Sequence, residues 1–169
     1  EIADINTARG NTGSGGTQTA AIIFGGQGPD DETETWNGTS WTEVGDLNTA
    51  RKAGGGSGTT TSALCYGGGP PQVDEVESWD GSSWTEIADI NTIRYYATGV
   101  GASSSDAMMV GGQNASPAYL GVVEKWDGSS WTEVADLNTN RSTLGGAGTT
   151  TAAVVYAAHS DGGSGVNTE

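Results

Sequence analysis

The chain has 169 residues, 29 of them glycine, and its 21 acidic and six basic side chains give a formal charge of −15 at pH 7. So acidic a surface repels phosphate backbones and anionic lipid, which argues against nucleic-acid binding, and no apolar run is long enough for membrane insertion. The single cysteine, Cys65, excludes an intramolecular disulfide and a multi-cysteine metal site.

The large aliphatic residues are few, and such a composition with a high net charge is typical of disordered chains. The six tryptophans argue against disorder because they recur at fixed places in a repeat. Each buried Trp removes roughly 200 Å² from water, worth on the order of 5 kcal/mol as an upper bound. We therefore expect one folded repeat domain.

The chain is organised around the stretch Trp79–Arg94, because close copies of it recur. Two copies run from Trp36 to Arg51 and from Trp126 to Arg141, and a partial copy without the Trp-containing part occupies residues 1–9. The period of 42 to 47 residues is that of one propeller blade or one repeat of a stacked array. A start in the middle of a repeat suggests an excerpt or a processed product.

The first unit begins after Arg9 with a Gly/Ser segment and continues into the apolar run 19–26, which together predict two paired strands. A looser acidic stretch follows and leads into residues 32–36. Asn37-Gly38 then predicts a tight turn into residues 40–44, and so a second hairpin. One unit is therefore expected to contain four strands.

The later units repeat this pattern, with apolar strands at 63–68, 107–112 and 153–158, and no segment shows the 3.6-residue period of a helix. Sixteen strand-sized segments predict four blades of four strands. Their expected ranges are 9–45, 51–88, 94–135, and 141–169 together with 1–5. In the last blade the N-terminal strand could close the ring and remove open sheet edges, and a larger ring is the alternative.

A Gly pair that ends an apolar strand, followed by an aromatic residue on the next strand and a Trp shortly after it, resembles the kelch repeat. The resemblance covers nearly the whole chain and implies an all-β fold of the kelch-type β-propeller class. There are two departures. Trp36, Trp79 and Trp126 stand where the family usually has Tyr, and the last copy has Ala157-Ala158 in place of the Gly pair.

The Gly/Thr/Ser-rich style of residues 16–21 and 36–43 is similar to kelch-like repeats in virion proteins of marine tailed phages, including cyanophages. That resemblance implies an extracellular location in the phage particle, in a tail, tail fibre or neck. It also implies membership of a larger assembly and contacts with other virion proteins or with host surface polysaccharide.

Kelch propellers include copper oxidases related to galactose oxidase, so the resemblance also allows an enzyme. Their centre needs several His and Tyr ligands and a Tyr–Cys crosslink, whereas this chain has one histidine, His159, expected in a loop, and Cys65 is expected in the core. A glycosidase needs two carboxylates at a defined separation, and the acids at 30–34 and 74–77 are expected on solvated faces. A calcium site at Asp30-Asp31 lacks the usual ligand spacing. We expect no catalytic residue, metal or cofactor, and a polysaccharide-degrading tail enzyme is the alternative.

Two sets of recurring residues are predicted to be structural. An arginine stands at one repeat position just after an Asn-Thr pair, and its fixed donors suit carbonyls or carboxylates of a neighbouring blade. These arginines are Arg9, Arg51, Arg94 and Arg141. The Trp pairs are predicted to flank the outer turns and to pack on their own or adjacent blades, with sugar stacking as the rival role. The pairs are Trp36/Trp41, Trp79/Trp84 and Trp126/Trp131.

The second turn of each unit is where the copies diverge in length and where all four prolines lie. Stiff loops lose less freedom on binding, and an exposed Tyr is a common anchor. We expect residues 27–31, 69–73, 113–120 and 159–165 to form the contact surface of a non-enzymatic structural and adhesion module, unless these loops merely vary for lack of constraint. The candidates are Gln27, Pro29, Asp30, Pro70, Pro71, Gln113, Asn114, Pro117, Tyr119 and His159.

Overall fold

A computed structural model of the chain describes residues 3–27, 31–69, 71–116, 118–156, 158–160 and 163–165. Within these ranges every regular element is a β-strand and neighbouring strands are antiparallel, so the predicted all-β fold without helices is confirmed. The same ranges contain no helix that is long and apolar enough to cross a membrane.

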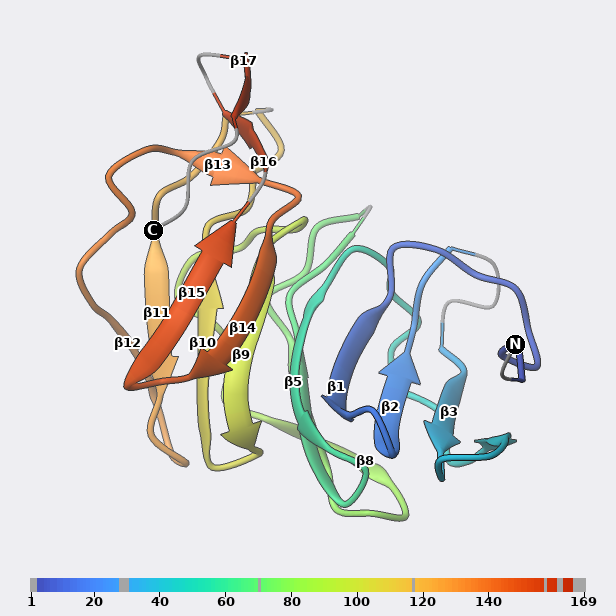
Figure 1. The fold of residues 1–169 in the computed structure, drawn as a ribbon. Coiled ribbons are helices and arrows are strands. Elements are labelled where there is room, and N and C mark those ends of the chain that lie inside the picture. The colour runs from blue at the N-terminus through green and yellow to red at the C-terminus, as the bar shows by residue number, and fades with distance from the viewer. Residues whose placement is uncertain are drawn as a thin grey trace.

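Three sheets have four strands each, arranged in chain order from the inner to the outer strand (Figure 1). The first consists of β1 (Gly13–Thr17), β2 (Ala20–Phe24), β3 (Thr33–Trp36) and β4 (Trp41–Glu43). The second consists of β5 (Gly55–Thr59), β6 (Ser62–Tyr66), β7 (Val76–Trp79) and β8 (Trp84–Ile87). The third consists of β9 (Thr98–Ser103), β10 (Asp106–Val110), β11 (Val123–Trp126) and β12 (Trp131–Glu133).

The rest of the chain forms two smaller sheets. One is the hairpin of β14 (Gly145–Thr149) and β15 (Ala152–Tyr156). The other joins β13 (Arg141–Ser142), β16 (Ala158–Ser160) and β17 (Gly163–Gly165). The described residues thus hold seventeen strands instead of the sixteen expected.

The outer hairpins follow the turn chemistry of their sequences. In each full sheet the two tryptophans face one another across the hairpin, as Trp79 faces Trp84. The turn between these two holds Gly81 at φ 101°, a conformation that suits glycine. The Asp80 carboxylate accepts the amide hydrogens of Ser82 and Ser83 at 2.8 and 2.9 Å, which fixes the turn.

The inner strands β1, β5, β9 and β14 lie next to one another in this order (Figure 1), so the sheets radiate from a common centre in a propeller-like arrangement. Glycine makes this close approach possible. A Cβ atom at Gly99 on β9 would lie 2.2 Å from the carbonyl oxygen of Gly56 on β5, a distance that no side chain could tolerate. The Gly-rich segments are therefore packing surfaces between sheets.

A chain of backbone hydrogen bonds joins the four repeats near this centre. Asn11, Ala53, Tyr96 and Thr143 occupy the same place in successive repeats, and all have left-handed φ values between 54° and 59°. Each of the last three donates its N–H to the carbonyl oxygen of the preceding one at 2.8 Å. A non-glycine residue adopts this conformation at a cost, which the bonds between repeats offset.

The apolar core lies between consecutive sheets. One cluster joins the first two sheets and includes Phe24, Cys65 and Trp84, and a second joins the next two and includes Tyr66 and Trp131. The smallest cluster, around Val110 and Val155, joins the third sheet to the β14–β15 hairpin. Sheet-to-sheet packing thus supplies most of the apolar burial.

The expected fourth blade, 141–169 together with 1–5, lies partly outside the described residues and stays a prediction. In the described part β14 and β15 form a hairpin without a third strand, and Ala3, Asp4 and Ile5 are not in a strand. The segment from Asn6 to Arg9 instead binds Glu34 of the first sheet, far from β15 (Figure 1). The hydrogen-bond donors of this segment hold it to the first sheet, which follows it in sequence. Closure of the propeller ring stays a prediction.

Candidate functional site

The segment that leads into each sheet, here called the linker, carries one of the recurring arginines. A repeated set of contacts, here called the clamp, holds this linker to the sheet that follows it. In the second repeat the Asn48 backbone and side-chain amides donate to Glu77 Oε2 at 2.7 and 2.8 Å, and the Thr49 amide donates to Oε1 at 3.1 Å. Arg51 forms an ion pair with the same carboxylate and donates to the Glu75 carbonyl oxygen at 2.6 Å. Five donors therefore converge on one short stretch of strand.

The same arrangement occurs twice more. Arg9 pairs with Glu34, assisted by Asn6 and Thr7. Arg94 pairs with Glu124, assisted by Asn91 and Thr92. Arg141 is also buried, and its Nε donates to the Thr139 carbonyl oxygen at 3.3 Å.

Hydrogen bonding keeps the carboxylates of Glu34 and Glu124 charged. Burial of Glu124 acts to raise its pKa, but the hydrogen bonds from Arg94 and Asn91 and the Arg94 charge together outweigh it, so the pKa is lowered. The pKa of Glu34 is lowered in the same way by Asn6, Arg9 and Thr7 against its burial. These glutamates are thus structural anions.

The expectation that the acids at 30–34 and 74–77 lie on solvated faces is wrong for Glu34 and Glu77, which are 0% and 1% exposed. Their burial has a tertiary cause, because the linker lies over the strand and replaces water with its own donors. A sequence signal was present, since a glutamate stands two residues before the first Trp of every pair: Glu34, Glu77 and Glu124.

The two tryptophans of each pair have different partners. The first donates its indole N–H to a carbonyl in a turn of its own sheet, as Trp79 does to Thr60 at 3.0 Å. The second Trp of the second and third pairs reaches back to the preceding unit. Trp84 packs edge-on against Phe24 with ring centroids 4.8 Å apart, and its indole donates to Thr33 Oγ1 at 3.0 Å.

Trp131 repeats this contact on Tyr66 at 5.3 Å, with its N–H bonded to the Ala88 carbonyl oxygen. Trp36 and Trp126 are buried like Trp79, whereas Trp41, the second Trp of the first sheet, is only partly buried. The recurring tryptophans thus lie in packing contacts, and Trp41 is the member with an accessible face.

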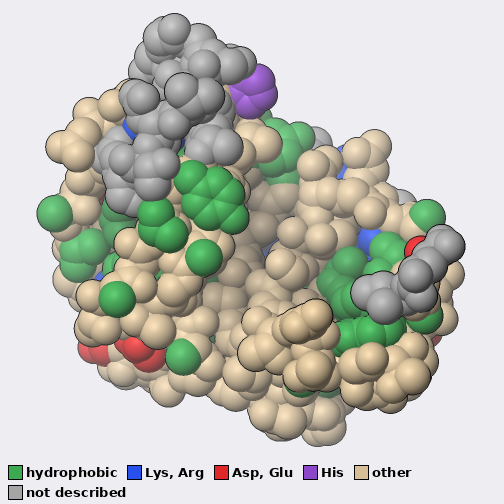
Figure 2. Space-filling model, viewed as in Figure 1, with side chains coloured by type: hydrophobic (Ala, Val, Ile, Leu, Met, Phe, Trp, Pro, Cys, Tyr) green, Lys and Arg blue, Asp and Glu red, His purple; other side chains and the backbone are tan. Residues whose placement is uncertain are grey.

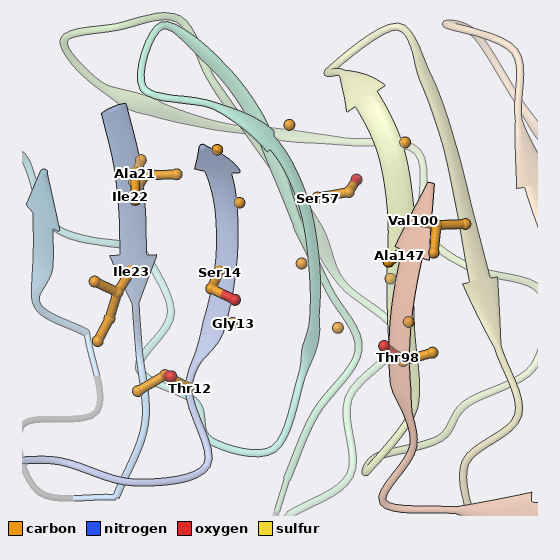
Figure 3. Close-up of a pocket in the computed structure, with 18 of the residues that line it drawn as sticks. Thr12, Gly13, Ser14, Ala21, Ile22, Ile23, Ser57, Thr98, Val100 and Ala147 are labelled. Atoms are coloured by element: carbon orange, nitrogen blue, oxygen red, sulfur yellow. The ribbon is translucent and has the colours of Figure 1, made fainter. Parts of the chain in front are cut away.

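A cavity of about 760 Å³ lies where the inner strands meet, and Figure 2 shows the surface hollowed between the half with β14–β15 and the half with β1–β3. Figure 3 shows that its walls come from β1, β2, β5, β9 and β14, with polar groups at Ser14, Ser57 and Thr98. Of the side chains that line it, Tyr156 alone carries a titratable group. Such a wall suits a neutral polar ligand and offers no acid–base pair.

Among the described loop candidates, Gln113 and Tyr119 lie close to β13. Gln113 is held firmly, since it exchanges both backbone hydrogen bonds with Tyr95, and its side-chain Nε2 lies 2.6 Å from the Tyr95 hydroxyl. Tyr119 bridges to Gln113, and Ser142 donates to Gln113 Oε1 at 3.3 Å. This polar cluster is a fixed platform beneath the loop.

The other candidates are more dispersed. Asn114 closes its loop by accepting the Ser116 amide at 3.0 Å, and Pro71 is exposed. The Gln27 amide donates to the Gly10 carbonyl oxygen at 2.6 Å, on the first unit. His159 is exposed but lies on strand β16, paired with Ser142, and not in the loop expected. Pro29, Asp30, Pro70 and Pro117 lie outside the described residues.

Cys65 and Tyr66 lie in the core, with no access to solvent. Burial raises the pKa of the Cys65 thiol to about 12, and burial likewise raises the pKa of Tyr66. Over the described ranges no three His, Cys, Asp or Glu side chains are grouped closely enough to hold a metal ion.

No protein-family model matches the chain, and no curated protein matches its sequence.

Proposed function

We propose that the chain is a kelch-type β-propeller, either a closed four-blade ring or part of a larger one, that serves as a non-enzymatic structural and adhesion module of a phage particle. One observation carries the proposal. The recurring arginines and most of the recurring tryptophans are engaged in contacts that hold the sheets together, while Gln113 and Tyr119 of a segment that differs between repeats form a polar cluster near the surface. A rigid frame with variable loops is the usual design of a binding protein.

The chemistry of the central cavity also favours binding over catalysis. Hydrolysis of a glycosidic bond in the usual way needs two carboxyl groups across the substrate, whereas the buried glutamates Glu34, Glu77 and Glu124 form ion pairs with arginines in the clamps. A copper oxidase centre would need His and Tyr ligands near a Cys. Here Cys65 is buried between two sheets and His159 lies exposed on β16.

The proposed partner is a host surface polysaccharide or a neighbouring virion protein, and the proposed place is a tail, tail fibre or neck. The style of the repeats supports the virion assignment. The net charge of −15 supports a partner other than nucleic acid.

Replacement of residues 114–118 by a Gly-Ser linker tests the role of the loops, because it leaves the Gln113–Tyr95 platform in place. The matched control is Thr61→Ala in an exposed turn at the opposite end. The purified proteins are incubated with immobilised surface polysaccharide from marine cyanobacteria, and phage carrying the same changes are scored for particle assembly and adsorption.

We expect the loop variant alone to lose polysaccharide binding or particle assembly at an unchanged melting temperature. Unchanged binding and assembly would rule the loop out. Release of new reducing ends from the polysaccharide would show an enzyme and contradict the proposal directly.

A further inference from the structure

Two adjacent tyrosines, Tyr95 and Tyr96, stand directly after the buried clamp arginine of the third repeat. Their aromatic rings pack on one another with centroids 4.8 Å apart at an angle of 45°, and both residues remain partly exposed. None of the three apolar clusters in the described part of the chain includes either ring. The pair therefore has a role other than packing in the core.

The backbone at Tyr96 argues for a specific use of this side chain. Tyr96 has a left-handed φ of 54°, which is costly for a bulky residue, and the first repeat has at this place an Asn, which adopts the conformation more easily. Ala53 and Thr143 hold the same conformation with small side chains. Neither the backbone nor the core thus requires an aromatic residue here, and strain of this kind is typical of ligand-binding sites.

Hydrogen bonds hold Tyr95 against the segment that varies between repeats. Gln113 Nε2 donates to the Tyr95 hydroxyl oxygen at 2.6 Å, and Gln113 Oε1 accepts the Ser142 hydroxyl at 3.3 Å. The Gln113 side chain thus uses one of its two donor hydrogens and one of its two acceptor lone pairs. The hydrogen of the Tyr95 hydroxyl has no acceptor among the described residues. Each of these groups can therefore bind a ligand hydroxyl, from a position that the existing bonds fix.

The hydroxyl groups of Tyr96 and Tyr119 are available as well. Within the described ranges neither oxygen has a hydrogen-bond partner and neither is buried, so both reach solvent. Tyr119 lies beside Gln113, to which its backbone bridges. Tyr96 borders a cavity of about 170 Å³, which is smaller than the roughly 300–1,000 Å³ of sites for drug-sized ligands. Contacts thus lead from this small cavity through the tyrosine pair to the loop with Tyr119.

The chemistry of this cluster selects an uncharged ligand that is rich in hydroxyl groups. Its members, here called the tyrosine platform, are Tyr95, Tyr96, Gln113, Tyr119 and Ser142. All five side chains are phenols, amides or hydroxyls without charge, and the charges of the adjoining clamp, Arg94 and Glu124, are paired with each other. Aromatic faces carry the negative part of the ring quadrupole and attract the C–H groups on one face of a sugar ring. The net charge of −15 opposes an acidic chain.

We infer that the tyrosine platform is a binding site for neutral polysaccharide. A sugar ring stacks on the exposed surface of Tyr95 and Tyr96, and its hydroxyl groups bind Gln113 and the tyrosine hydroxyls. The platform lacks the Arg, Met and aliphatic side chains that accompany aromatic residues in the core of a protein interface, so a glycan fits it better than a protein. This inference rests on the proposed adhesion function and deepens it, because it names the site and the class of glycan.

Oligosaccharides from the surface polysaccharide of marine cyanobacteria, separated by anion exchange into a neutral and an acidic fraction, test the site in the intact chain. Protein with isotope-labelled tyrosine rings is titrated with each fraction and followed by NMR. We expect the neutral fraction to shift the signals of Tyr95, Tyr96 and Tyr119. It should leave unchanged Tyr66, which is buried, and Tyr156, which is 45% exposed on β15. The acidic fraction should shift none of the five.

Two variants taken from the other repeats separate binding from folding. Tyr96→Asn copies the first repeat and Tyr95→Ser copies the fourth, so both residues suit the backbone. Tyr96→Asn should change the melting temperature little, since Asn adopts the left-handed conformation readily. Its affinity for the neutral fraction should fall about ten-fold or more, as expected for loss of an aromatic anchor. Tyr156→Val, which removes an exposed tyrosine outside the platform, should leave the affinity unchanged.

Three results would overturn the inference and leave the proposed adhesion function standing. They are a shift of Tyr156 alone, which would place the sugar in the central cavity, equal affinity of both platform variants and the unchanged protein, and tighter binding of the acidic fraction. Loss of particle assembly in phage with Tyr96→Asn, at unchanged affinity for sugar, would assign the platform to a protein contact and also overturn it. Failure of the unchanged protein to bind either fraction would overturn both this inference and polysaccharide as the proposed partner.

Discussion

Replacement of Arg94 by lysine should destabilise the protein although the positive charge is kept. Arg94 is fully buried, and its two terminal nitrogens bind the Glu124 carboxylate, the Thr92 carbonyl oxygen at 2.8 Å and the Met109 carbonyl oxygen at 3.2 Å. The single nitrogen of lysine can keep the carboxylate but cannot reproduce the planar fork. One or two hydrogen bonds to a charged group are lost, at about 1.5–3 kcal/mol each.

The expected loss is therefore roughly 3 kcal/mol of unfolding free energy, which for a chain of this size corresponds to a fall in melting temperature of roughly 6–12 °C. Urea titration followed by Trp fluorescence measures it. Lys125→Ala is the control, because Lys125 makes one partly exposed ion pair with Asp106 at 3.7 Å and should change the midpoint little. An unchanged midpoint for Arg94→Lys together with a lowered one for Lys125→Ala would refute the structural role of the clamp.

Three further predictions concern packing and pH. Trp84→Ala should lower the unfolding free energy measured in urea by roughly 3–5 kcal/mol, because it removes a buried ring between two sheets. Thr85→Ala, at the exposed neighbouring residue, should be nearly neutral. Equal effects of the two changes would argue against the packing role. Gly99→Ala should prevent stable folding as judged by near-UV circular dichroism, since its Cβ would lie 1.8 Å from the Tyr66 hydroxyl, and a normal spectrum would place β9 farther from β5. Hydrogen bonds from neighbouring amides and hydroxyls lower the pKa of the Asp80 and Asp127 carboxyls to about 2, below the usual 3.8. The largest contribution comes from Ser83 for Asp80 and from Ser129 for Asp127. The stability that these aspartates contribute is therefore complete above pH 4 and lost as the pH falls toward 2. The unfolding midpoint of Asp80→Asn should therefore fall less steeply with pH over that range than that of the unchanged protein. An equal slope of midpoint against pH in the two proteins would exclude this contribution.

The hairpins could be predicted from the sequence because their signals are local. Asn37-Gly38 and Asp80-Gly81 demand tight turns, and the flanking tryptophans fix the register on either side. The apolar strands at β2, β6 and β10 end at Gly pairs and were predicted within a residue or two of their positions. Internal repetition strengthened the strand predictions, because the same sequence pattern occurs in several copies.

Features that arise between repeats could not be predicted in the same way. Glu34 and Glu77 look like solvent-facing residues of a strand, and only the linker that lies over them makes them buried anions. The left-handed residues of the central hydrogen-bond chain include an alanine and a threonine, Ala53 and Thr143, which carry no local signal for that conformation. The contact partner of each buried aromatic side chain likewise depends on which repeat unit lies next to it in space.

Hydrogen exchange at the amides of Ala53, Tyr96 and Thr143 tests most directly the central claim that the repeats form one cooperative body around a common centre. Each of these amides donates to the preceding repeat, so it can exchange only when two repeats separate. We predict that all three exchange with the same opening free energy as Leu64 in the buried strand β6. Fast exchange at these three amides beside a protected Leu64 would show that the sheets are independent and would contradict the account.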